Sequence, residues 1–188
     1  HGLIAAVGFH LYTRLLTKAV ADLRRGSAFG PEAAAAHLSL YHPLINVDLP
    51  MEIGIPPEYV QDKAMRLKLY RRLADLHDLR EIEALDEEFR DRFGPPPEEA
   101  LNLLFQLKVK VLAEQAGLNS ISGEGGKLAL RFPAQAEGQP PRRYPQLGAG
   151  VRTSKNHVWL SGMDEADWQH RLVMVLEALV GDAAGQPA

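Results

Sequence analysis

The sequence predicts an α+β fold, in which a small, mostly antiparallel sheet packs with a block of helices. Apolar and polar residues alternate over residues 44–55, as in a half-buried strand. Three amphipathic helical segments follow within residues 62–116. The period then returns to two on both sides of a glycine-rich turn in residues 120–132. Strands separated by a helical block favour α+β over a doubly wound parallel sheet, in which strands and helices alternate.

Composition bounds the possible functions. The chain has 188 residues, of which 46% are hydrophobic, and this is enough to bury a core. Its formal charge of −3 argues against a dedicated nucleic-acid-binding protein, which is usually strongly basic. The absence of cysteine excludes disulfides, thiol nucleophiles and cysteine-based zinc sites. No apolar run is long enough to predict a membrane span, and we expect a cytoplasmic protein.

The N-terminal part of the sequence indicates a fragment of a longer protein. The chain starts at His1 rather than Met and runs directly into a segment with helical periodicity over residues 7–23. We therefore expect a helix over residues 7–23, and residues 26–43 have the composition of a linker. We expect an independent domain over residues 44–182 and a flexible tail over residues 183–188.

The first predicted strand and the three helices have clear boundary signals. Pro50 would remove one ladder hydrogen bond, so the strand over residues 44–55 is expected either at a sheet edge or with a bulge. Helices are expected at 62–76, 78–93 and 97–116. Asp62 and Asp78 are the expected N-caps of the first two, and Glu81 would complete a capping box.

Each helix also has a predicted apolar face. These faces comprise Met65, Leu69, Leu73 and Leu76 in the first helix, Leu79, Ile82, Leu85 and Phe89 in the second, and Leu101, Leu104, either Leu107 or Lys108, Val111 and Leu112 in the third. Such faces at 3–4 residue spacing predict a helical block that buries one stripe of each helix.

The remainder of the chain returns to strands. Residues 120–122 and 127–132 flank a Gly-Glu-Gly-Gly turn, which predicts a β-hairpin. Residues 133–150 are rich in Pro, Gly and Gln and are expected to form a loop. A short strand near 158–160 and a helix over 164–180 complete the prediction, with fraying from Gly181.

No catalytic constellation is present in the sequence. The seven histidines show no HExxH spacing for a metal, and no G-x-S-x-G elbow supports a serine nucleophile. A phosphate-binding P-loop ending at Lys127 would need Gly at position 121 and Ser or Thr at 128, where Ile121 and Leu128 stand. We therefore predict a chain that is not an enzyme and carries no cofactor or metal.

One candidate surface is acidic and lies on the predicted helix 78–93. Glu81, Glu88 and Asp91 fall on one stripe, turned away from the apolar face, and Arg92 flanks them. Such a stripe can dock against Arg or Lys of a partner. From the residues alone, a solvated helix face is the favoured interpretation.

A second candidate surface is basic. Between residues 127 and 155, six cationic side chains accompany a single carboxylate. Arg142 and Arg143 adjoin Tyr144, which could stack on a nucleic-acid base, and Lys155 lies nearby in sequence. The alternative is a loop whose charge only keeps it solvated.

Several strings together resemble one known family. Residues 1–12 read His-x5-Val-Gly-Phe-x-Leu-Tyr, 48–50 read Asp-Leu-Pro, 55–60 read Ile-Pro-x2-Tyr-Val, 66–73 read Arg-Leu-x-Leu-Tyr-Arg-Arg-Leu and 91–96 read Asp-Arg-Phe-Gly-x-Pro. In this order they resemble the end of the helicase core and the C-terminal domain of the bacterial transcription-repair coupling factors. The likeness covers about residues 1–132, and the Pro-rich loop at 133–150 departs from it.

The resemblance implies a function. Residues 1–25 would be the exit helix from a preceding helicase core, and 44–182 the family's α+β C-terminal regulatory domain. Family members are ATP- and Mg-dependent translocases on double-stranded DNA that act on stalled RNA polymerase in nucleotide-excision repair, at the bacterial nucleoid.

The resemblance also implies a role for the acidic stripe. The C-terminal domain of the family has no motor motif and docks on the N-terminal module of the same protein, where it masks the surface that binds the excinuclease A subunit. By position, Glu88 and Asp91 match the acidic docking residues of the family, and helical phase adds Glu81. We expect a monomeric, non-catalytic, autoinhibitory fragment with no membrane contact. The open alternative is an accessory nucleic-acid-binding module.

Overall fold

The computed structural model describes residues 45–185, which form four helices and five strands. The helices are α3 (Lys63–Ala74), α4 (Leu79–Phe93), α5 (Glu98–Gln115) and α6 (Trp168–Gly185), and the strands are β1 (Asn46–Asp48), β2 (Ser120–Glu124), β3 (Lys127–Arg131), β4 (Val151–Ser154) and β5 (His157–Ser161). The predicted helix within residues 1–25 and the linker at 26–43 lie outside the described residues.

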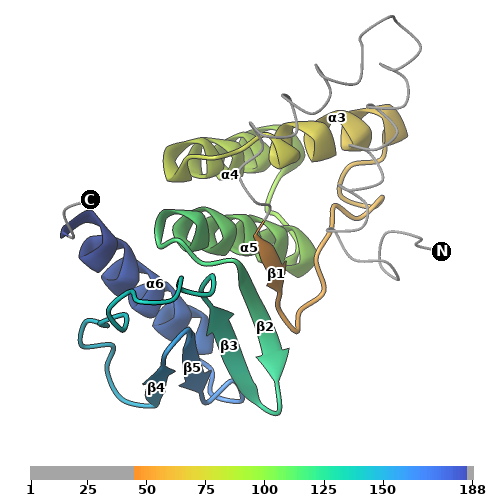
Figure 1. Ribbon diagram of the computed structural model, residues 1–188. Coiled ribbons are helices and arrows are strands. Elements are labelled where there is room, and N and C mark those ends of the chain that lie inside the picture. The colour runs from red at the N-terminus through yellow and green to blue at the C-terminus, as the bar shows by residue number, and fades with distance from the viewer. Residues whose placement is uncertain (1–44, 186–188) are drawn as a thin grey trace, which may run out of the picture.

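The elements form three layers, with α5 in the middle. Helices α5 and α6 lie against one face of the sheet, and α3 and α4 lie on the opposite side of α5 (Figure 1). The strand order is β1-β2-β3-β5-β4, with one parallel pair, β1 with β2, and three antiparallel pairs. The predicted α+β class and its mostly antiparallel sheet are therefore confirmed.

Two hydrophobic cores share α5. The first lies between the sheet and helices α5 and α6; the second lies among α3, α4 and α5. Val109 and Leu112 of α5 contribute to the first core, whereas Leu103 and Leu107 contribute to the second. A helix buried on two sides carries apolar residues over most of its circumference, so its inward stripe cannot be located from periodicity alone.

The ends of α3 and α4 follow their sequence signals. The Asp62 carboxylate accepts hydrogen bonds from the backbone N–H groups of Ala64 and Met65, as an N-cap does. Asp78 caps α4 through the N–H of Arg80. At its other end, α4 stops at Gly94, whose φ of 83° is unfavourable for residues with a Cβ atom.

The predicted strand 44–55 is the main difference from the sequence interpretation. Only Asn46–Asp48 pair with the sheet, at its edge, which is one of the two alternatives that the sequence left open. Pro50 follows two residues later, and the chain then runs along α5. Asn102 donates a hydrogen bond to the carbonyl of Glu52, and the N–H of Gly54 donates to the carbonyl of Glu99. The side chains after Asp48 therefore alternate between buried and exposed because the segment packs against a helix, although it forms no β-ladder.

The C-terminal half differs from the prediction in extent. The hairpin forms as expected, with Gly125 and Gly126 both at positive φ, as a two-residue type I′ turn requires. Strand β4 was not predicted, and α6 begins four residues later than expected and runs to Gly185, past the predicted fraying point. The prediction that Leu101 faces inward was wrong, because it is 41% exposed.

Candidate functional site

Helix α4 presents the predicted acidic stripe on the outer layer of the domain. Its inner side is fixed by Ile82, Leu85 and Phe89, which are buried in the second core. The Phe89 ring makes edge contacts with Tyr59 and Phe93, at centroid distances of 6.2 and 6.1 Å. These contacts set the rotation of the helix about its axis and therefore decide which residues face solvent.

Glu88 lies within the domain's own ion-pair network. Its carboxylate binds the guanidinium of Arg72 on α3 and that of Arg92 one turn along α4. The hydrogen bond from Arg72, supported by that from Arg92, lowers the pKa of Glu88 despite its partial burial. Glu88 thus ties α3 to α4, and its charge is largely neutralised within the domain.

The other residues of the predicted stripe differ in their roles. Glu81 accepts a hydrogen bond of 3.4 Å from the N–H of His77, so it supports the start of α4. Besides binding Glu88, the Arg92 guanidinium lies over the Phe93 ring at 5.1 Å. Asp91 is exposed, and within the described part of the chain no ion-pair partner is found for it. Asp91 is therefore the member of the stripe best placed to meet a partner.

The Glu88 network makes a pH-dependent contribution to stability. Because folding lowers the pKa of Glu88, this contribution is present above the unfolded pKa of about 4.3 and is lost as pH falls through the folded value. We expect Glu88→Gln to lower the free energy of unfolding by up to about 1 kcal/mol at pH 7. Urea titrations at pH 7 and pH 3 should show the difference shrinking in acid; an equal loss at both pH values would contradict the assignment.

The basic segment is more structured than the sequence indicated. Loop 133–150 packs back onto the end of β3, where the Arg142 guanidinium lies 4.1 Å from the centre of the Phe132 ring. The Tyr144 ring packs at 5.7 Å from Phe132, and its hydroxyl donates to the carbonyl of Lys155. Burial raises the pKa of the Tyr144 phenol. Arg142 and Tyr144 therefore hold the loop in place, whereas Arg143 and Lys155 are exposed.

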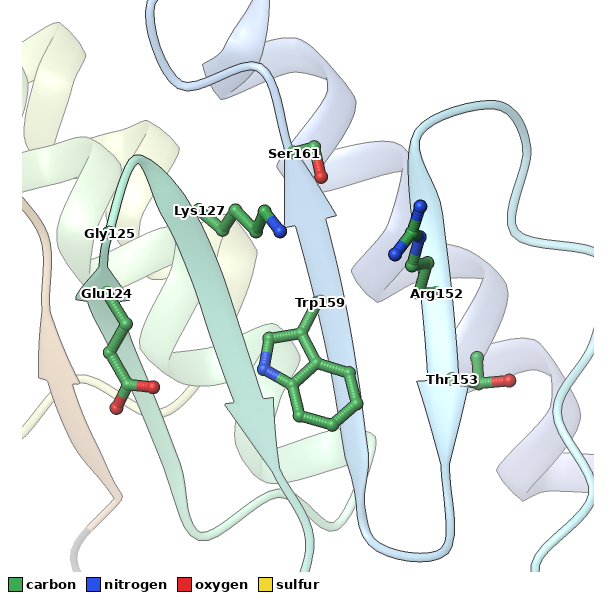
Figure 2. Close-up of a pocket in the computed structure, with 7 residues that line it drawn as sticks. All are labelled: Glu124, Gly125, Lys127, Arg152, Thr153, Trp159 and Ser161. Carbon is green, nitrogen blue, oxygen red and sulfur yellow. The ribbon is translucent and has the colours of Figure 1, made fainter.

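A third surface, which the sequence interpretation missed, is the sheet face opposite α5 and α6. Trp159 of β5 projects from this face over the strands, and the helices lie behind the sheet (Figure 2). An open hollow of about 610 Å³ lies beside it, lined by Glu124, Gly125, Lys127, Arg152, Thr153, Trp159 and Ser161. The signal available in the sequence was the alternation over residues 157–161, which puts His157 and Trp159 on the face opposite Val158 and Leu160.

Within residues 45–185, no cluster of three or more His, Asp or Glu side chains could hold a metal ion. The helices there are also too short or too polar to cross a membrane. Three surfaces of the described residues are candidates for interaction: the acidic stripe of α4, the basic loop 133–150 and the open sheet face.

Comparison with known proteins gives one consistent family. The family model described as "TRCF domain" matches residues 49–142. Among curated proteins, the transcription-repair-coupling factor of Mycobacterium bovis is 29% identical over 81% of this chain, and that of Rickettsia bellii is 31% identical over 72%. The transcription-repair-coupling factor of Staphylococcus haemolyticus is 26% identical over 96% of this chain. The matched regions cover only 13%, 11% and 15% of these relatives, respectively.

A solved structure supports the same fold. The chain is similar to the structure described as the "C-terminal domain of transcription-repair coupling factor", with a TM-score of 0.62 and 17% sequence identity. The similarity covers 78% of this chain and 99% of that chain.

Proposed function

The chain belongs to the family of the TRCF domain, and from this premise we propose that it is the C-terminal regulatory domain of a bacterial transcription-repair coupling factor. The curated relatives carry that name, and the matched segment is a small part of each of them. The longer protein would use ATP and Mg to move on double-stranded DNA, act on RNA polymerase and bind the excinuclease A subunit in the cytoplasm. The domain itself would be monomeric, non-catalytic and without membrane contact.

In this proposal, the domain restrains the longer protein by docking on its N-terminal module. The acidic face of α4 is the observation that carries the proposal. By the acidic face we mean the exposed carboxylates of Glu83, Glu87 and Asp91, which follow one another at four-residue spacing and share only Asp91 with the predicted stripe. These carboxylates can meet a basic partner without first breaking an ion pair within the described residues. Complementary charge of this kind fixes orientation and partner choice more than affinity.

We assign different roles to the residues of the predicted stripe. Asp91 would contact the partner. Glu88 would act from behind, because it holds Arg72 and Arg92 in place beside the docking face. Glu81 stabilises the start of the helix that presents the face. Docking would mask the surface of the N-terminal module that binds the excinuclease A subunit.

Binding between separate pieces tests the docking proposal. We expect the 188-residue chain to bind the isolated N-terminal module, and Asp91→Arg to weaken binding at least about tenfold, because like charges then face each other. Titration calorimetry at two salt concentrations measures both the affinity and its electrostatic part. Glu137→Arg is the matched control, since it makes the same charge change in the exposed loop. Equal binding by Asp91→Arg and wild type would refute docking through α4.

A further inference from the structure

The open sheet face combines aromatic and cationic side chains in aligned rows. On β5, the rings of His157 and Trp159 are parallel to within 8°, at a centroid distance of 5.1 Å. The strand register places Arg152 of β4 directly across from Trp159 on one side and Ala129 of β3 on the other. The Trp159 indole lies in front of the sheet, on the side away from the helices (Figure 2).

Charge on this face is unevenly distributed. Glu124 neutralises Arg131, and Asp48 belongs to the far edge strand. Lys127 and Arg152, by contrast, are exposed and line the hollow beside Trp159, and no described carboxylate pairs with either of them. In a chain with a formal charge of −3, this places local positive charge around an aromatic ring.

We propose that this face binds single-stranded DNA, with one base stacked on Trp159 and the neighbouring phosphates held by Arg152 and Lys127. Aromatic stacking with flanking cations is the general chemistry by which proteins recognise single strands. It works with any nucleotide sequence, because every base has a π-face. A duplex hides those base faces, so it could offer this surface only its phosphates.

This surface takes two cations, Lys127 and Arg152, from the basic segment 127–155 but does not use its loop residues. Arg142 and Tyr144 are occupied with Phe132, so their rings and charges are already used within the domain. The proposal is independent of docking through α4, which belongs to the outer helical layer. An experiment can therefore refute DNA binding without refuting docking, and it can refute docking without refuting DNA binding.

Tryptophan fluorescence gives a direct test, because the chain has only two tryptophans. In the Trp168→Phe variant, Trp159 is the only indole, and we expect saturable quenching by a twelve-nucleotide oligo-dT strand. The reciprocal Trp159→Phe variant, which retains Trp168, should show no quenching. The proposal would be refuted if the Trp168→Phe variant showed no quenching at low salt. It would also be refuted if duplex DNA, or an oligo-Glu peptide, bound as tightly as the single strand.

Anisotropy of the labelled strand separates stacking from charge. We expect Trp159→Ala to weaken binding about tenfold. Arg152→Glu, an exposed change that leaves the packing intact, should lower the slope of log affinity against log salt by about 0.7. Arg80→Glu on α4 is the matched control and should bind like wild type. An equal loss in Arg80→Glu and Arg152→Glu, or a preference for oligo-U RNA over oligo-dT, would overturn the assignment.

Discussion

Replacement of Phe89 by Ala is expected to lower the free energy of unfolding by about 3–5 kcal/mol, the range for a fully buried Phe truncated to Ala. Phe89 is 0% exposed and lies at the centre of the core among α3, α4 and α5. Its removal also takes edge contacts from Tyr59 and Phe93, whose rings pack with each other at 5.8 Å. Urea denaturation followed by circular dichroism measures the loss.

A matched control is available on the neighbouring helix. Leu101 of α5 is 41% exposed, so Leu101→Ala should change stability by less than about 1 kcal/mol. If the two variants lost equal stability, Phe89 would not be buried as described. The assignment of the helix face that α4 presents to solvent would then be wrong as well. The stability of this core therefore bears directly on the docking proposal.

The sequence predicted elements well where one periodicity and clear end signals coincide. Helix α4 has a single apolar stripe, an Asp78 cap and a Gly-Pro terminus, and it forms within one residue of the predicted range. The hairpin around Gly125 was predicted for the same reason: the turn needs two residues at positive φ, and glycine supplies them.

The prediction failed where contacts between elements, rather than strand pairing or helical periodicity, decide which side chains are buried. Residues after Asp48 keep their alternation because they pack along α5, not because they pair with a strand. Strand β4 shows the opposite case. It is an edge strand whose residues are mostly exposed, so no apolar alternation marks it. Leu101 was misplaced because α5 is buried on two sides and has no single inward stripe.

The candidate surfaces could be predicted only in part. Helical phase put Glu88 and Asp91 on one stripe, but phase carries no information about Arg72, which comes from another helix and pairs with Glu88. Likewise, Arg142 and Tyr144 suggested a stacking site, whereas the fold places Phe132 against both of them. The row formed by Ala129, Trp159 and Arg152 depends on strand register across a crossover, which local sequence does not reveal.

The Arg72–Glu88–Arg92 network also decides which substitution tests autoinhibition cleanly. Glu88→Arg would bring three guanidinium groups together and would loosen the contact between α3 and α4. On a solvated helix face such a reversal would change stability by less than about 0.5 kcal/mol. The ion pairs of Glu88 predict a larger cost. Asp91→Arg avoids the problem, because Asp91 has no ion-pair partner among the described residues.

In the longer protein that we propose, Asp91→Arg is therefore expected to release the motor from restraint. Setting like charges against each other across a docked surface can cost about 3 kcal/mol, which is roughly a hundredfold shift from the closed towards the open state. ATP hydrolysis in the absence of RNA polymerase should rise, and binding of the excinuclease A subunit should become measurable without polymerase. Glu137→Arg, with the same charge change in the loop, should leave both at wild-type levels. If Asp91→Arg leaves both unchanged while its melting temperature matches that of wild type, the acidic face of α4 is not the restraint.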